Sequence, residues 1–106
     1  MAKTVQAKNI NHPGHTEQLN ERKYTVIREA ILAVLPRGDA GMTHREFTVQ
    51  VEQVVKKRLK DEADELFPRR GSYGWYCKAV QLDLEARKLI RRLDKTSPLR
   101  FVRTGR

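Results

Sequence analysis

The chain has 106 residues and a formal net charge of +9, with 39% hydrophobic and 33% charged residues. This length and composition are typical of one globular domain with a well-charged surface. No apolar run approaches the ~20 residues that a membrane span needs, and the polar N-terminus is unlike a secretory signal. The single cysteine, Cys77, excludes a disulfide within the chain. We therefore expect a cytoplasmic domain without membrane contact.

The first 19 residues show neither helical nor strand periodicity. They contain His12-Pro13-Gly14, a combination typical of a turn. We expect residues 1–19 to form an extended arm that is partly ordered against residues 20–106, which would make up the domain itself.

Three helices are predicted after the arm. The first begins at Asn20, a good N-cap, and ends at Pro36. The second begins at Thr43, because Thr43 and Glu46 have the spacing of a capping box. The third begins near Ser72 and runs towards the C-terminal strands.

The third helix is predicted to be apolar on two sides. One apolar line consists of Trp75, Ala79, Leu82 and Ala86, and the other consists of Tyr76, Val80 and Leu84. We expect Trp75 to lie in the core and the tyrosines Tyr73 and Tyr76 to be buried or half-buried. The stripe predicted to face solvent consists of Lys78, Gln81, Glu85 and Lys88.

Two strands are predicted on either side of a turn at residues 94–98, where Asp, Lys, Thr, Ser and Pro follow one another. If Leu93 pairs with Leu99, then Arg92 and Arg100 face each other across the hairpin. Like charges in that position cost stability, and a bound anion would relieve the cost.

The predicted elements follow one another in the order of a winged helix-turn-helix domain. Gly41-Met42, just before the second helix, can supply a short third strand to the C-terminal hairpin. The predicted fold class is therefore α+β: a winged helix with three helices, a C-terminal β-hairpin wing and an extended N-terminal arm.

Several segments of the chain are similar to those of a known family. They are Asn11-His12-Pro13-Gly14, Tyr24 to Leu35, Gly41-Met42-Thr43, Gly74-Trp75-Tyr76, Val80-Gln81-Leu82-Asp83-Leu84 and Ala86-Arg87. Through them the chain resembles a family of small, functionally uncharacterised bacterial proteins with a winged-helix-like fold. The resemblance covers most of the chain. Because its motifs are mainly core residues and turns, it implies a fold and no particular activity.

Most of the positive charge is concentrated at the C-terminal end. From Arg87 onward, eight Arg and Lys residues stand against a single acid, Asp94. Such a local positive field attracts polyanions. The candidate nucleic-acid-binding residues are Lys78, Gln81 and Lys88 on the third helix and Arg91, Arg92, Lys95, Arg100 and Arg103 on the hairpin. We expect binding of double-stranded DNA through backbone contacts, with weak sequence preference.

The basic hairpin also has simpler interpretations. It can be a solvated face, or its charges can protect an edge strand from unwanted pairing. The alternative function is a winged helix that binds proteins and no nucleic acid. In that case Tyr76, Val80 and Leu84, or the arm, would contact a protein partner or a second copy. Exposure of that apolar line in the monomer would favour this alternative.

Catalytic and metal-binding patterns are missing from the sequence. It has no glycine-rich phosphate loop, paired metal-ligand motif or nucleophile–base pairing. His12 and His15 lack a Cys or acidic partner nearby in the sequence that would complete a metal site. Cys77 is expected to be a structural thiol and His44 to face solvent. We predict a protein that is not an enzyme and needs neither metal nor cofactor.

Overall fold

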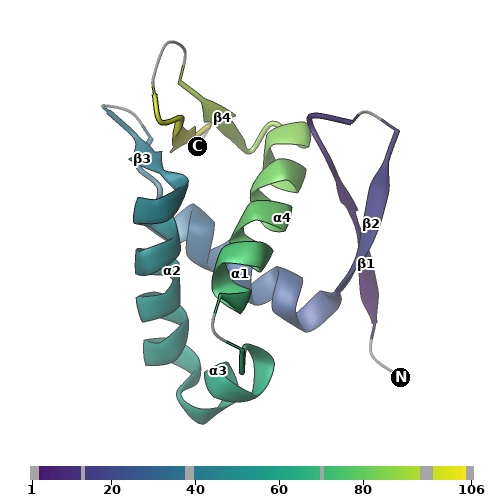
Figure 1. Cartoon of the computed structure of the whole chain (residues 1–106), viewed down its shortest axis with the longest axis vertical. Coiled ribbons are helices and arrows are strands. Elements are labelled where there is room, and N and C mark those ends of the chain that lie inside the picture. Colours follow the sequence, from purple (N-terminus) through teal and green to yellow (C-terminus); the bar gives the residue numbers. More distant parts are fainter. Residues whose placement is uncertain (1–2, 13, 38–39, 70, 94–96, 105–106) are drawn as a thin grey trace.

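In the computed structural model, four helices pack together, with a three-stranded sheet at one end of them and a two-stranded hairpin at one side (Figure 1). The structure describes residues 3–12, 14–37, 40–69, 71–93 and 97–104, and these numbers of helices and sheets refer to them. The chain is therefore α+β, with a two-stranded hairpin at its N-terminal end and a three-stranded sheet at its C-terminal end.

The first two long helices begin where the sequence predicts. Helix α1 (Glu21–Val34) is capped by Asn20, whose side chain accepts a 3.0 Å hydrogen bond from the Lys23 backbone N–H. Helix α2 (His44–Leu59) begins with the predicted capping box. The Thr43 hydroxyl accepts from the Glu46 N–H at 3.1 Å, and the Glu46 carboxylate accepts from the Thr43 N–H at 2.9 Å.

A short helix that the sequence did not predict follows α2. Helix α3 (Asp61–Leu66) begins after Lys60, whose positive φ of 53° interrupts the helical path. It buries Ala63, and Phe67 packs into the core directly after it. Helix α4 (Ser72–Ala86) then begins at the predicted residue.

The C-terminal sheet consists of β3 (Met42–Thr43), β4 (Ile90–Arg92) and β5 (Arg100–Arg103), in the order β3-β5-β4. The predicted third strand is thus confirmed. The predicted register is wrong by one residue, because Arg92 lies opposite Phe101 and not opposite Arg100. Phe101 and Val102 are both buried, so simple alternation along the strand did not indicate which pairing the core requires.

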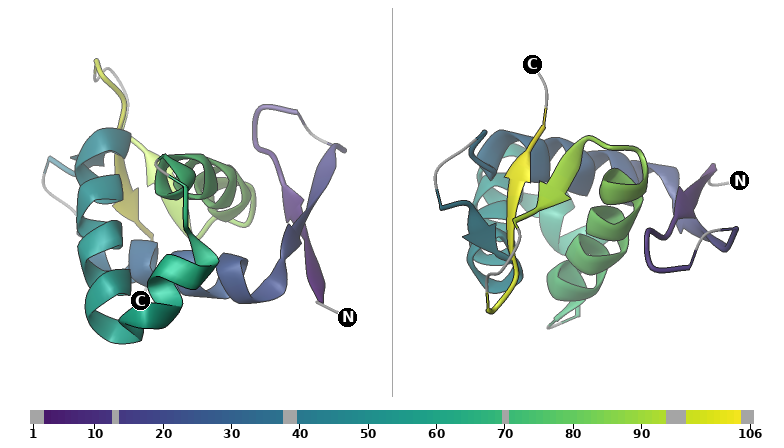
Figure 2. Two further views of the ribbon diagram at one scale, coloured as in Figure 1. Left: turned by 60° about the horizontal axis from the view of Figure 1, so that its bottom comes forward. Right: turned by 90° about the horizontal axis from the view of Figure 1, so that it is seen from above.

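The N-terminal residues form a hairpin rather than the extended arm that we expected. Strand β1 (Thr4–Lys8) pairs with β2 (Thr16–Asn20), which leads directly into α1. The hairpin and α2 lie on opposite sides of α4 (Figures 1 and 2). Ala7 and Leu19 are buried, which confirms that this segment is ordered against the rest of the chain. Its strands are mostly polar, so the alternation of apolar and polar residues was too weak to predict strands there.

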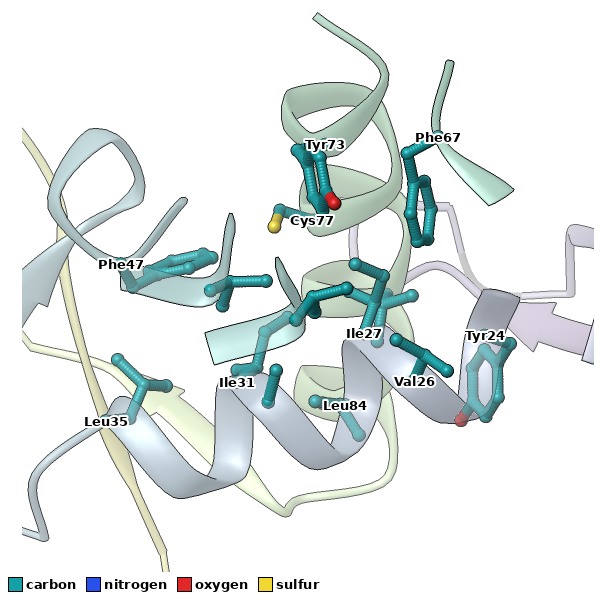
Figure 3. Close-up of a cluster of buried hydrophobic side chains, with 14 of the residues drawn as sticks. Tyr24, Val26, Ile27, Ile31, Leu35, Phe47, Phe67, Tyr73, Cys77 and Leu84 are labelled. Atoms are coloured by element: carbon teal, nitrogen blue, oxygen red, sulfur yellow. The ribbon is translucent and has the colours of Figure 1, made fainter. Parts of the chain in front are cut away.

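The core lies where α1, α2 and α4 meet (Figure 3). Ile27 and Ile31 of α1 and Phe47 of α2 are fully buried there, together with Leu84 of α4. Cys77 is also fully buried, and burial raises the pKa of its thiol to about 12. A neutral, inaccessible thiol is consistent with the structural role that we predicted.

Candidate nucleic-acid interface

The two apolar lines of helix α4 differ in how deeply they are buried. Val80 and Leu84 are fully buried, while Trp75 keeps 51% of its surface exposed. Ala79, Leu82 and Ala86, which share the line of Trp75, are all half-buried. The prediction that Trp75 lies in the core is therefore wrong. Helical spacing defines two lines, but only packing decides which of them the neighbouring helices cover.

The predicted polar stripe of α4 also contains both exposed and buried residues. Lys78 and Lys88 are exposed, as expected, whereas Gln81 and Glu85 are buried. The Gln81 amide donates a 3.0 Å hydrogen bond to the Glu85 carboxylate. The prediction that Gln81 and Glu85 face solvent is therefore wrong, and the burial of Gln81 argues against its predicted contact with nucleic acid.

Arg92 of β4 neutralises the buried Glu85. Its Nε donates to Glu85 Oε1, and its Nη2 lies 3.3 Å from Glu85 Oε2 and 3.2 Å from the Asn11 side-chain oxygen. Arg92 thus joins strand β4 to α4 and to the loop of the N-terminal hairpin. Its guanidinium is engaged inside the protein, which argues against the predicted role as a phosphate ligand.

Asp83 is the centre of a second buried polar cluster, which the sequence did not predict. Its side chain is fully buried and accepts hydrogen bonds from the Lys8 backbone N–H at 2.7 Å, from Arg87 Nε at 2.9 Å and from the Tyr24 hydroxyl. Burial, followed by the bond to Asp83, raises the pKa of Tyr24 to about 12. The only sequence signal was an acid between two leucines, Leu82 and Leu84.

The remaining predicted residues lie in different surroundings. Arg91 is exposed, while Arg100 donates a 3.2 Å hydrogen bond to the Gly41 carbonyl and lies 3.5 Å from Glu46. Arg103 is half-buried. Lys95 lies outside the described residues, as do residues 94 and 96 of the predicted turn. The structure therefore brings together only part of the predicted set.

A hollow of about 470 Å³ lies between the N-terminal hairpin and β4, beside the C-terminal end of α4. Its charged lining residues are Lys88, Arg91, Arg92 and Glu85, and Arg92 and Glu85 pair with each other. Lys88 adopts a left-handed conformation with φ of 64°, directly after the helix, where glycine is usually found. The net positive charge of the hollow therefore comes from Lys88 and Arg91.

His44, at the start of α2, is half-buried instead of facing solvent. Its ring packs against Phe47 at 5.1 Å between centroids, with the planes at 76°. Burial, and then the charge of Lys78, lower its pKa. The charge of Lys78 on α4 therefore acts on a side chain at the N-terminus of α2.

Two observations concern the described residues alone. Nowhere among them do three or more His, Cys, Asp or Glu side chains gather as a metal site would require. Within the same residues, no helix has the length and apolar character needed to cross a membrane.

Comparison with known proteins identifies a family. A family model described as a family of unknown function, DUF6958, matches residues 4–101, so the chain belongs to that family. No curated protein matches the chain significantly. No solved structure does so either.

Proposed function

We propose that this domain is a winged helix that binds double-stranded DNA through the phosphate backbone. The order of α1, β3, α2, α4, β4 and β5 supports the winged-helix assignment. In that fold, α4 takes the place of the recognition helix, and the β4–β5 hairpin takes the place of the wing.

The observation that carries the proposal is the set of exposed cations along α4 and into β4. Lys78, Lys88 and Arg91 are exposed, and none of them belongs to an ion pair in the described part of the chain. Glu85, two turns after Lys78 on the same side of α4, would repel phosphate if it were free. Its pairing with Arg92 removes that repulsion.

The same geometry supports weak sequence preference. Direct recognition of bases needs hydrogen-bonding side chains that project into a groove. Gln81 and Glu85 are buried, and the outward line of α4 is largely apolar around Trp75 and Leu82. Affinity would therefore come mainly from phosphate contacts and would fall steeply with added salt.

A salt titration tests the proposal. Binding to a fluorescent duplex of mixed sequence is measured by anisotropy at several KCl concentrations. We expect Lys88→Ala/Arg91→Ala to weaken binding on every sequence alike and to flatten the slope of log K against log salt by about two, because each phosphate contact contributes about 0.9.

A matched control separates a defined site from general attraction to a basic protein. Lys57→Ala/Arg58→Ala removes one Lys and one Arg from exposed positions on α2 and changes the net charge equally. It should leave the salt slope almost unchanged. Equal effects of the two double variants, or no duplex binding by the unaltered protein at low salt, would contradict the proposal.

The alternative is a protein-binding winged helix that uses either the line of Tyr76, Val80 and Leu84 or the N-terminal residues, and the burial of part of this line makes the first route less favourable. Val80 and Leu84 are fully buried in the monomer, and of this line only Tyr76 stays half-buried. Only the line of Trp75 faces outward, and it leads to a separate surface at the other end of α4.

A further inference from the structure

A second hollow, of about 460 Å³, lies beside the N-terminal end of α4. We call it the Trp75 groove. Its apolar walls come from Leu66, Pro68, Trp75 and Tyr76. Lys23 and Arg69 also line it, and both of its charged lining residues are therefore cations.

The aromatic wall of the groove is held by the core. Trp75 packs edge-to-face on Tyr76 at 5.0 Å between ring centroids, and Tyr76 packs edge-to-face on Phe67 at 5.6 Å. Lys23 Nζ lies 5.5 Å from the centre of the Tyr76 ring. Trp75 thus stays half exposed on a supported surface, which suits a contact with another molecule.

The electrostatics of the groove favour an anionic occupant. Lys23 and Arg69 supply full positive charges. Gly71, the N-cap of α4, provides no side-chain cap, so the backbone N–H groups of the first turn add partial positive charge at the same place. The pKa of Tyr76 is raised mainly by burial and secondly by the charge of Glu17 on the hairpin, so an acid borders the groove on that side.

We propose that the Trp75 groove binds an acidic segment of a partner protein. An aliphatic or aromatic side chain of that segment packs against Trp75, between Leu66 and Pro68. Flanking carboxylates face Lys23 and Arg69. The combination of a rigid aromatic anchor with a polar, charged rim is typical of protein-binding surfaces.

Two other occupants fit the groove less well. A second copy of this chain carries a net charge of +9, which opposes its approach to a groove lined by cations. Single-stranded nucleic acid stacks its successive bases on several aromatic faces. Among the described residues, Trp75 is the only exposed large apolar side chain that is aromatic, so a row of stacking faces is missing there.

Trp75 is the only tryptophan of the chain, so its fluorescence reports directly on the groove. The probe is a 12-residue peptide with a central Leu-Phe pair flanked by Asp and Glu. We expect a saturable blue shift of the tryptophan emission on titration. A peptide with Ala in place of the Leu-Phe pair, and one with Lys in place of the acids, should produce no such shift.

Variants assign the binding to named residues, with the labelled peptide followed by anisotropy. Trp75→Ala should weaken binding by about 30-fold, as for a central aromatic anchor. Lys23→Ala/Arg69→Ala should weaken it by about tenfold. Lys57→Ala/Arg58→Ala is again the control and should bind as the unaltered protein does. Circular dichroism confirms that each variant is folded.

Several results would overturn the proposal. One is the absence of a fluorescence change with the acidic peptide. A second is an equal or larger change with single-stranded oligothymidine, which would assign the groove to nucleic acid. A third is a change that depends on protein concentration alone and accompanies dimer formation in light scattering, which would assign it to a second copy.

Discussion

The two ends of α4 lie about 22 Å apart along one helix, and they differ in which kind of side chain is buried. At the C-terminal end, the charged side chains of Asp83 and Glu85 are buried. At the N-terminal end, the large aromatic side chain of Trp75 is half exposed. Burial here follows from available partners and not from residue polarity, since a buried charge is tolerated when it is paired and hydrogen-bonded.

The buried acids also lie at the unfavourable end of the helix dipole, where negative charge is disfavoured. Arg87 lies 2.9 Å from Asp83, and Arg92 pairs with Glu85. These two arginines offset both the burial and the dipole. Part of the C-terminal positive charge therefore belongs to the fold, whereas Lys88 and Arg91 are exposed and face outward.

The largest expected effect comes from removing Asp83. Asp83→Ala leaves the Tyr24 hydroxyl, the Lys8 N–H and the Arg87 guanidinium without their acceptor. We expect a loss of about 4 kcal/mol in the free energy of unfolding, as for a broken buried pair, measured by urea denaturation. Glu62→Ala is the control, because its pair with Arg22 is about half exposed to solvent and exposed ion pairs contribute little to stability. Similar losses in both variants would contradict the contrast between buried and exposed pairs.

A somewhat smaller loss in the free energy of unfolding is expected for Arg92→Ala, because it leaves the buried Glu85 carboxylate without its cation. The cost should be about 3 kcal/mol, again from urea denaturation. Adding Glu85→Gln should restore most of it, because a neutral amide no longer needs a cation. If the double variant is no more stable than Arg92→Ala alone, the pairing of these two side chains is not what stabilises this end of α4.

Alkaline pH tests the Asp83 cluster without a substitution. Tyr24 has its pKa raised to about 12, against an ordinary value of 10.0. Its stabilising contribution is therefore complete below pH 10, where the unfolded tyrosine begins to ionise, and is lost as the pH rises towards 12. Absorbance at 295 nm should show one tyrosine that ionises near pH 12. In Asp83→Asn, that ionisation should move to lower pH.

The smallest effect is expected at Lys88, and it should separate stability from binding. Lys88→Gly relieves the left-handed conformation and should stabilise the fold by about 1 kcal/mol, seen as a higher urea midpoint. The same change removes one exposed cation and should flatten the salt slope of DNA binding by about one. Unchanged DNA affinity in this more stable variant would remove Lys88 from the interface.

Local signals in the sequence predicted much of the backbone. Asn20 and the Thr43–Glu46 capping box marked two helix starts correctly, because capping depends on residues within one turn of each other. The third strand at Met42 was also predicted. The family resemblance rested on core and turn segments such as Gly74-Trp75-Tyr76, and the match over residues 4–101 agrees with it in one respect, that the family has no known function.

The candidate site was predicted less completely. The exposed positions of Lys78, Lys88 and Arg91 agree with the structure, since long cationic side chains seldom lie fully buried. Gln81 and Glu85 were assigned to the surface because helical spacing put them on one polar stripe, and Arg92 was assigned there because nothing in its strand indicated a buried acid as partner. Glu85 reaches Arg92 only after β4 folds back beside α4.

The sequence by itself therefore determined the helix starts, the place of the C-terminal hairpin and the excess of positive charge. All of these depend on residues that are close together in the chain. Tertiary structure alone decided which line of α4 is buried, that the N-terminal residues form a hairpin, and which arginines are paired. The burial of α4 and the pairing of the arginines depend on contacts between distant segments, and one such contact, of Lys8 with Asp83, also holds the N-terminal hairpin. Helical or strand periodicity does not specify the geometry of these contacts.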